Sequence, residues 1–172
     1  MKSKILITSF RTWLPHHKSN SSDDLLEIFQ QQQYNLFSLD FIRNLPVDTE
    51  LASQRVIKII ENIKPDAVIC CGMAESRNRL TIESSAVCQR KCLKTDVNLE
   101  VLKSLLASTD ISHDAGKFVC EGLYFQVLQH ITKSNTNYIP CLFVHVPLLT
   151  NSNLESIKKD FLLILEFIVK SR

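Results

Sequence analysis

Two short stretches of the sequence carry residues that could act as a nucleophile and a general base. Cys120 follows the turn signal Asp114-Ala115-Gly116 and lies at the start of an apolar-periodic segment typical of a helix. The partial positive charge at a helix N-terminus favours the thiolate, which is the nucleophilic form of cysteine. His145 lies in a short apolar run, residues 139–146, that predicts a buried strand. A cysteine at a helix start and a histidine in a strand suit the roles of nucleophile and base.

Each of these residues also has a purely structural interpretation. Free cysteine is among the most buried residue types, and a histidine in an apolar strand is more often a hydrogen-bonded core residue than a base. The remaining cysteines indicate no metal site: Cys70 and Cys71 lie inside an apolar run, and Cys88 and Cys92 would supply only two of four zinc ligands. We therefore expect free thiols, no metal and no organic cofactor.

The size and charge of the chain restrict its function classes. It has 172 residues and a formal net charge of +2, with basic residues scattered rather than clustered, which predicts one domain over 1–172 and no nucleic-acid partner. Its longest apolar run, 161–169, is far shorter than the roughly 20 residues of a membrane span. The N-terminus enters a strand without a signal-peptide core, so we expect a cytoplasmic protein with no membrane partner.

Alternating strand and helix patterns predict the elements that position Cys120 and His145. Strands are expected at 4–10, 34–45, 67–71, 80–88, 109–112 and 139–146, and helices at 23–33, 49–63, 99–107, 118–131 and 153–170. This order predicts a three-layer α/β/α single domain with a twisted, mostly parallel central sheet. The last helix has an apolar stripe wide enough for a second copy of the chain to cover, so a homo-oligomer is a candidate.

Further motifs lie in order along the chain. They are Ile5 to Phe10 followed by Trp13 and Asn20, Leu45-Pro46-Val47, Ile63 to Asp66 with Cys71 to Ala74, Arg77 with Thr81-Ile82-Glu83, Asp114 to Cys120, and Phe143 to Pro147. In this order and spacing they resemble the pyroglutamyl peptidase I (pyrrolidone-carboxylate peptidase) family of cysteine peptidases. The resemblance covers most of the chain and implies a phosphorylase/hydrolase-like α/β fold.

The resemblance also implies roles for individual residues. Cys120 would be the nucleophile, His145 the general base and then acid, and Glu83 the group that orients the imidazole, because a carboxylate on one ring nitrogen fixes the tautomer and supports the imidazolium. Backbone N–H groups at the helix start would stabilise the oxyanion. Phe10 and Trp13 occupy the positions of the aromatics with which the family holds a small neutral lactam ring; their alternative role is to cover the sheet edge.

The expected function is thus that of a cysteine-type omega-peptidase. It would release N-terminal pyroglutamate from N-terminally blocked peptides through a thioester acyl-enzyme. One alternative is a related amidase acting on another small acyl group. Another is a weakly active or inactive homologue that binds peptide ends or a protein partner.

The chain also departs from the family pattern near the expected site. Leu14-Pro15 replaces Gly-Gly after the second aromatic, and Glu121 replaces Asn after the nucleophile. A carboxylate beside Cys120 is expected to raise the pKa of the thiol by repelling the thiolate. The segment 88–97 is shorter than in the family, which predicts a site more open to water, and it carries Arg90, the candidate for the family's arginine near the oxyanion.

Overall fold

Continuous apolar runs form the central strands, because a strand covered on both faces needs apolar residues at successive positions. In the computed structural model, which describes residues 2–134 and 138–170, all six residues of β8 (Cys141–Val146) are buried. So are the first six of β3 (Ala67–Met73) and the last six of β1 (Ser3–Phe10). The three expected strands are therefore present, and β3 extends through Gly72 and Met73, which were expected in a loop.

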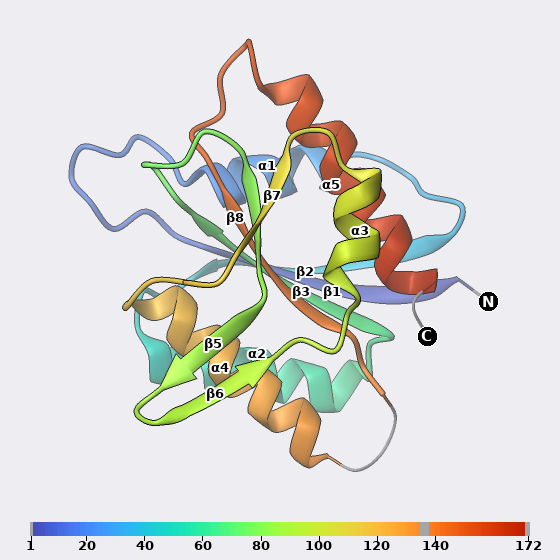
Figure 1. The fold of residues 1–172 in the computed structure, drawn as a ribbon. Helices are drawn as coiled ribbons and strands as arrows, with labels where there is room; N and C mark the ends of the chain where they lie inside the picture. The colour runs from blue at the N-terminus through green and yellow to red at the C-terminus, as the bar shows by residue number, and fades with distance from the viewer. Residues whose placement is uncertain (1, 135–137, 171–172) are drawn as a thin grey trace.

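Within the described residues, six strands make one sheet in the order β2-β1-β3-β8-β4-β7 (Figure 1). The outer members are β2 (Phe37–Leu45), β4 (Leu80–Glu83) and β7 (Thr109–Ser112). Neighbouring strands are parallel except at one junction, where β4 runs antiparallel to β8. The expected mostly parallel α/β sheet is confirmed. The expected domain range, 1–172, begins and ends on residues that lie outside this description.

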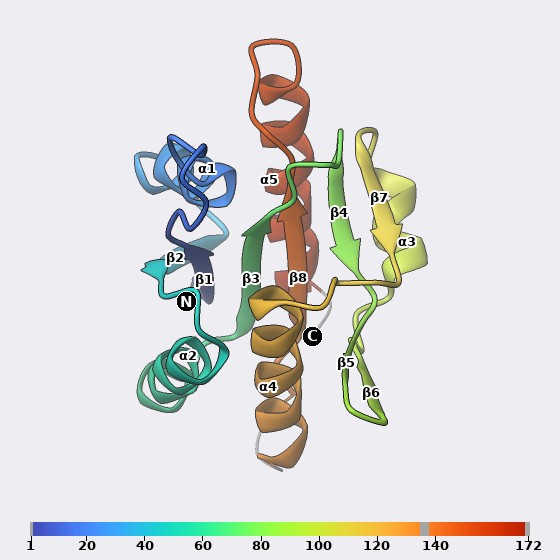
Figure 2. The same ribbon diagram turned by 90° about the vertical axis from the view of Figure 1, so that its left-hand side faces the viewer.

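In the part of the chain that the structure describes, five helices cover the two faces of the sheet. They are α1 (Ser21–Gln30), α2 (Thr49–Ile63), α3 (Leu99–Leu105), α4 (Val119–Lys133) and α5 (Leu154–Lys170). In Figure 2, α2 and α4 lie in the lower part of the picture and α1 and α5 in the upper part. Strand alternation divides the core accordingly: Ile69 packs with apolar residues of α1, α3 and α5, whereas Val68 packs with those of α2 and α4. The three expected layers are present.

Local capping explains where the helices begin. The side chains of Asn20, Asp48 and Asn98 accept backbone N–H groups of the first turns of α1, α2 and α3. The expected start of the first helix at about Asp23 was therefore late by two residues. At its other end α2 stops at Lys64, which has a φ of 47° and precedes Pro65.

The single strand expected at 80–88 is wrong. The chain leaves the main sheet at Ser84, and the following residues form β5 (Ser85–Cys88), which pairs with β6 (Lys91–Lys94) in a separate antiparallel hairpin. The strand β6 was not expected, because its residues are largely exposed and show no apolar alternation. The hairpin packs against α4.

No helix within residues 2–134 and 138–170 has both the length and the apolar character needed to cross a membrane. The wide apolar stripe of α5 is instead used within the fold. Ile157, Phe161, Ile164 and Leu165 of α5 are buried in the core on its side of the sheet.

Candidate active site

The loop between β7 and α4 places Cys120 in the first turn of α4. Gly116 in this loop has a φ of 90°, which an L side chain rarely adopts, and its N–H donates to Asp114 Oδ1 at 3.0 Å. The N-cap residue of α4, Phe118, provides no side-chain cap. The first N–H groups of a helix have no intrahelical partner. Those of this first turn are therefore available for a developing negative charge beside the Cys120 sulfur.

His145 lies near the carboxyl end of β8, where its neighbours are Gly72 of β3 and Thr81 of β4. It is 5% exposed, and its Nδ1 lies 2.7 Å from Glu83 Oε1. A carboxylate can only accept, so Nδ1 carries the proton in this pair. The hydrogen bond thus leaves Nε2 as the nitrogen that can accept a proton.

Glu83 is fully buried at the end of β4; its Oε1 is hydrogen-bonded, whereas its Oε2 has no hydrogen-bond partner among the described residues. Burial alone would raise the pKa of this carboxyl, but hydrogen bonds from His145, Ser112 and Arg77 outweigh it and hold the pKa below its ordinary value of 4.5. The backbone oxygen of Glu83 accepts the hydroxyl of Tyr124, a buried residue of α4, at 3.1 Å. Glu83 is therefore an anion that connects the histidine strand with the cysteine helix.

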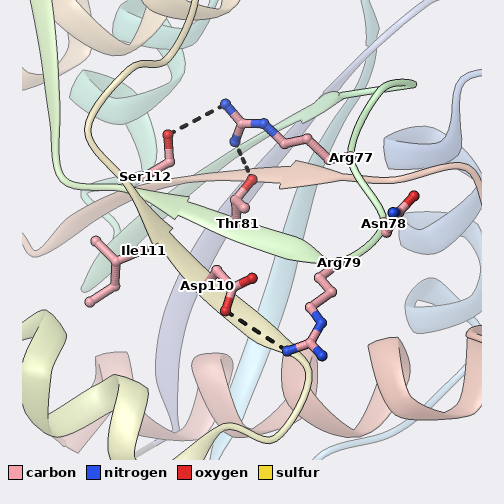
Figure 3. Close-up of a pocket in the computed structure, with 7 residues that line it drawn as sticks. All are labelled: Arg77, Asn78, Arg79, Thr81, Asp110, Ile111 and Ser112. Atoms are coloured by element: carbon pink, nitrogen blue, oxygen red, sulfur yellow. Dashed lines mark hydrogen bonds and ion pairs between the residues drawn. The ribbon is translucent and has the colours of Figure 1, made fainter.

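Arg77, on the loop after β3, is the main polar residue whose contacts the sequence did not indicate. Its Nη1 lies 2.5 Å from Glu83 Oε1 and also donates to Thr81. Its Nη2 donates to the backbone oxygen of Asp114 at 3.0 Å and faces Ser112 Oγ at 3.4 Å. Figure 3 shows the guanidinium reaching Thr81 and Ser112. Arg77 thus neutralises Glu83 and holds the loop that leads to Cys120.

A cavity of about 200 Å³ joins Cys120 and His145. Its other walls contain three aromatic rings, two of which, Phe10 and Trp13, were expected from the sequence. The third, Phe118, was missed; its ring centroid lies 4.8 Å from that of Trp13. The described residues that complete the wall are Asn20, Val47, Met73, Ala115 and Val119.

The sequence indicated that the helix N-terminus would favour the Cys120 thiolate, and the structure differs. Burial raises the pKa of Cys120 to about 12, with further contributions from Cys70 and Glu83, whereas Arg77 lowers it. Cys120 is therefore a thiol at neutral pH in this structure.

The sequence predicts that Glu121 repels the Cys120 thiolate, but in the structure its carboxylate has another partner. The carboxylate of Glu121 turns toward the hairpin, where Oε1 accepts the Val87 N–H at 3.1 Å. Glu121 therefore holds the hairpin against α4.

Two further features bear on the expected site. A Cβ built on Gly72 would lie only 2.6 Å from Cys120 Sγ, so this glycine leaves the space that the sulfur occupies. Arg90 lies exposed in the turn of the β5–β6 hairpin. It is not among the described residues that line the cavity, so this structure offers no support for Arg90 as an oxyanion arginine.

Nucleophilic acyl transfer is the chemistry that such an arrangement can perform, and it places the chain among the cysteine-type hydrolases. No family model matches the chain. Curated relatives do: it is 27% identical to the pyrrolidone-carboxylate peptidase of Brachyspira hyodysenteriae over 98% of both chains. It is 26% identical to that of a Thermoanaerobacter species over 85% of this chain and 83% of the relative. The chain is a homologue of the pyrrolidone-carboxylate peptidases.

Solved structures share the fold along nearly the whole chain. A variant of the pyrrolidone carboxyl peptidase of Pyrococcus furiosus superposes with a TM-score of 0.84 at 19% identity, covering 97% of this chain and 98% of that one. The pyroglutamyl peptidase I of Bacillus amyloliquefaciens gives a TM-score of 0.81 at 19% identity, covering 99% and 95%. At this identity the structures establish the fold.

Proposed function

We propose that this protein is a cysteine-type omega-peptidase that releases N-terminal pyroglutamate from peptides. The observation that carries the proposal is that Cys120 and His145 line one small cavity while Glu83 binds the far nitrogen of the imidazole. The names of the curated relatives support the same activity.

The cavity suits a small neutral ring. Its volume of about 200 Å³ is below the roughly 300–1,000 Å³ of sites for drug-sized ligands. Among the described residues of its wall, only Cys120 and His145 have titratable side chains. Neither a free α-ammonium nor a free carboxylate would find a charged partner there, whereas a lactam carries no charge to be desolvated.

The reaction would begin from the thiol. As Cys120 Sγ attacks the carbonyl carbon of the pyroglutamyl group, its proton passes to His145 Nε2, and Glu83 stabilises the imidazolium through Nδ1. The first-turn N–H groups of α4 would hold the oxyanion. His145 then protonates the departing amine, which leaves a thioester. Water, deprotonated by His145, attacks the thioester and returns the thiol with free pyroglutamate.

Phe10, Trp13 and Phe118 would hold the ring. Their aromatic faces supply contact area without charge, and the contact between Trp13 and Phe118 fixes the outer side of the cavity. Trp13 and Phe118 are 52% and 53% exposed, so a bound ring would cover apolar surface that now faces water.

A fluorogenic pyroglutamyl amide tests the proposal directly, with the corresponding prolyl amide as matched control. The prolyl ring has the same size but carries a charged amine and no lactam oxygen. Turnover of the first amide only, abolished by Cys120→Ala and retained in Cys92→Ala, is the expected result. Cys92 is an exposed cysteine of the hairpin and is not among the described residues of the cavity wall.

The same assay separates the alternatives. Hydrolysis of other small acyl amides in preference to pyroglutamyl amides would indicate a related amidase. Binding of a pyroglutamyl peptide without turnover would indicate an inactive homologue.

We further infer a cytoplasmic location, because all six cysteines are unpaired and exposed thiols persist in reducing compartments.

A further inference from the structure

Two loops beside the aromatic wall of the cavity meet through a cluster of nitrogen and oxygen ligands. The loop between β1 and α1 carries His16 and His17, and the loop after β3 carries Glu75. His17 Nε2 lies 3.0 Å and His16 Nε2 3.4 Å from the same oxygen, Glu75 Oε2. One ligand atom from each of the three residues falls within 4.8 Å of the others. The proposed peptidase reaction uses none of these three residues.

The spacing of these atoms matches that around a tetrahedral ion. Zinc lies about 2.0–2.1 Å from imidazole nitrogen and carboxylate oxygen, so two ligand atoms on a tetrahedral ion are about 3.3 Å apart. The two nitrogen–oxygen distances, 3.0 and 3.4 Å, are on either side of that value. An ion could therefore replace the present contacts with small movements of the side chains.

One ligand is already held in place. The side chain of His17 is only 6% exposed, and its ring packs edge-on against that of His16, with centroids 4.2 Å apart. Its Nδ1 is buried and has no hydrogen-bond partner among the described residues. Because a carboxylate only accepts, Nε2 carries the proton in its present contact with Glu75. No described group occupies Nδ1, so the proton can move there and leave the Nε2 lone pair for a metal ion. His16 and Glu75 are more exposed, which leaves a path for the ion.

We propose that His16, His17 and Glu75 form a binding site for a divalent transition-metal ion of the zinc class. Two imidazoles, one carboxylate and a water molecule would complete a four-coordinate shell. The bound ion would cross-link the loop that carries Trp13 to the loop that carries Arg77. This proposal replaces the expectation of a chain without metal, which considered only the cysteines.

The chain itself supplies the reporter and the control. Trp13 is the only tryptophan and lies three residues before His16, so a bound Co²⁺ ion should quench its emission. His130 and Glu61 form another histidine–carboxylate contact, at 3.9 Å, on helices α4 and α2. Among the described residues this pair is not part of a three-ligand group, so His130→Gln is a matched control.

The experiment is a Co²⁺ titration of the Cys120→Ser protein, followed by tryptophan emission and by the visible absorption of the ion, with Zn²⁺ as competitor. Removing Cys120 prevents binding at the thiol of the cavity. We expect one ion per chain, displaced by Zn²⁺, with an absorption spectrum that lacks the thiolate charge-transfer band. Loss of a single orienting partner of a metal ligand typically weakens affinity 10–100-fold. His17→Gln and Glu75→Gln should weaken binding by at least about tenfold, and His130→Gln should leave it unchanged.

Three results would overturn the proposal. One is the absence of saturable binding at submillimolar Co²⁺. Another is binding that His17→Gln and Glu75→Gln leave intact. The third is a thiolate band that disappears when Cys88 and Cys92 are replaced, which would place the ion at the hairpin. None of these measurements uses peptidase activity, so they succeed or fail independently of the proposed function.

Discussion

Substitution of Gly72 by alanine should disable the nucleophile without removing it. The added Cβ would lie 2.6 Å from Cys120 Sγ, whereas ordinary van der Waals contact begins near 3.4 Å, so about 0.8 Å of movement is required. The opposite side offers no room, because Phe143 Cζ would be 3.0 Å away. The sulfur must shift or rotate about χ1, and either movement takes it away from its position relative to His145.

The size of the effect follows from that displacement. A misplacement of about 1 Å in a reacting group can cost about 10²-fold in rate, which corresponds to roughly 2.7 kcal/mol. We therefore expect kcat/KM for a pyroglutamyl amide to fall by about 100-fold. Overpacking against Phe143 should also lower the free energy of unfolding by about 1–3 kcal/mol.

A second glycine provides the control. In Gly122→Ala the new Cβ would lie 2.5 Å from Thr49 Cγ2, at the contact between α4 and α2. This variant should lose stability but keep most of its activity well below its melting temperature. Activity of Gly72→Ala within about threefold of the unsubstituted protein would refute the steric argument, as would equal losses of activity in both variants.

Four other predictions concern Glu83, Cys120 and Glu121. Glu83→Gln should lower kcat by about 10²- to 10⁴-fold, the range expected when the imidazole loses its orienting carboxylate. Because the folded pKa of Glu83 lies below 4.5, its ionised form stabilises the fold above that pH, and this stabilisation is lost as the pH falls through the folded value. Thermal melts of Glu83→Gln should accordingly depend less on pH below 4.5 than those of the unsubstituted protein. Alkylation of Cys120 by iodoacetamide, followed by mass spectrometry, should be slow at pH 7 and still accelerate at pH 10, because burial raises the pKa to about 12; a plateau near neutral pH would contradict this. Glu121→Gln should leave the pH dependence of Cys120 alkylation unchanged, because the amide oxygen can still accept the Val87 N–H. A shifted midpoint would show that Glu121 does repel the thiolate.

Local sequence patterns were sufficient for most of the main sheet. The buried runs of β3 and β8 have no polar alternation, and only a strand covered on both faces suits them. The motif resemblance, rather than local chemistry, selected Glu83 from the acidic residues of the chain. In the structure Glu83 is fully buried.

The remaining features depend on long-range contacts that no local pattern encodes. Strand direction is one: β4 pairs antiparallel with β8, so Glu83 reaches His145 diagonally across the pair and not from a shared carboxyl edge. The raised pKa of Cys120 is another, because part of it comes from Cys70, which is distant in sequence. Glu121 found its partner, the Val87 N–H, in a hairpin that the sequence did not predict.

Because Glu83 is bonded to both Arg77 and His145, its substitution during evolution would have other consequences than substitution of Cys120. Substitution of Cys120 would abolish the proposed hydrolysis but leave the fold intact. Loss of Glu83 would leave the partly buried Arg77 without its carboxylate and remove the partner of His145 Nδ1. A lineage that no longer needed the reaction would therefore be expected to keep this carboxylate long after the thiol had gone. In such a lineage, a retained Glu83 would indicate selection for a stable fold. A retained Cys120 would indicate continued selection for the proposed catalysis.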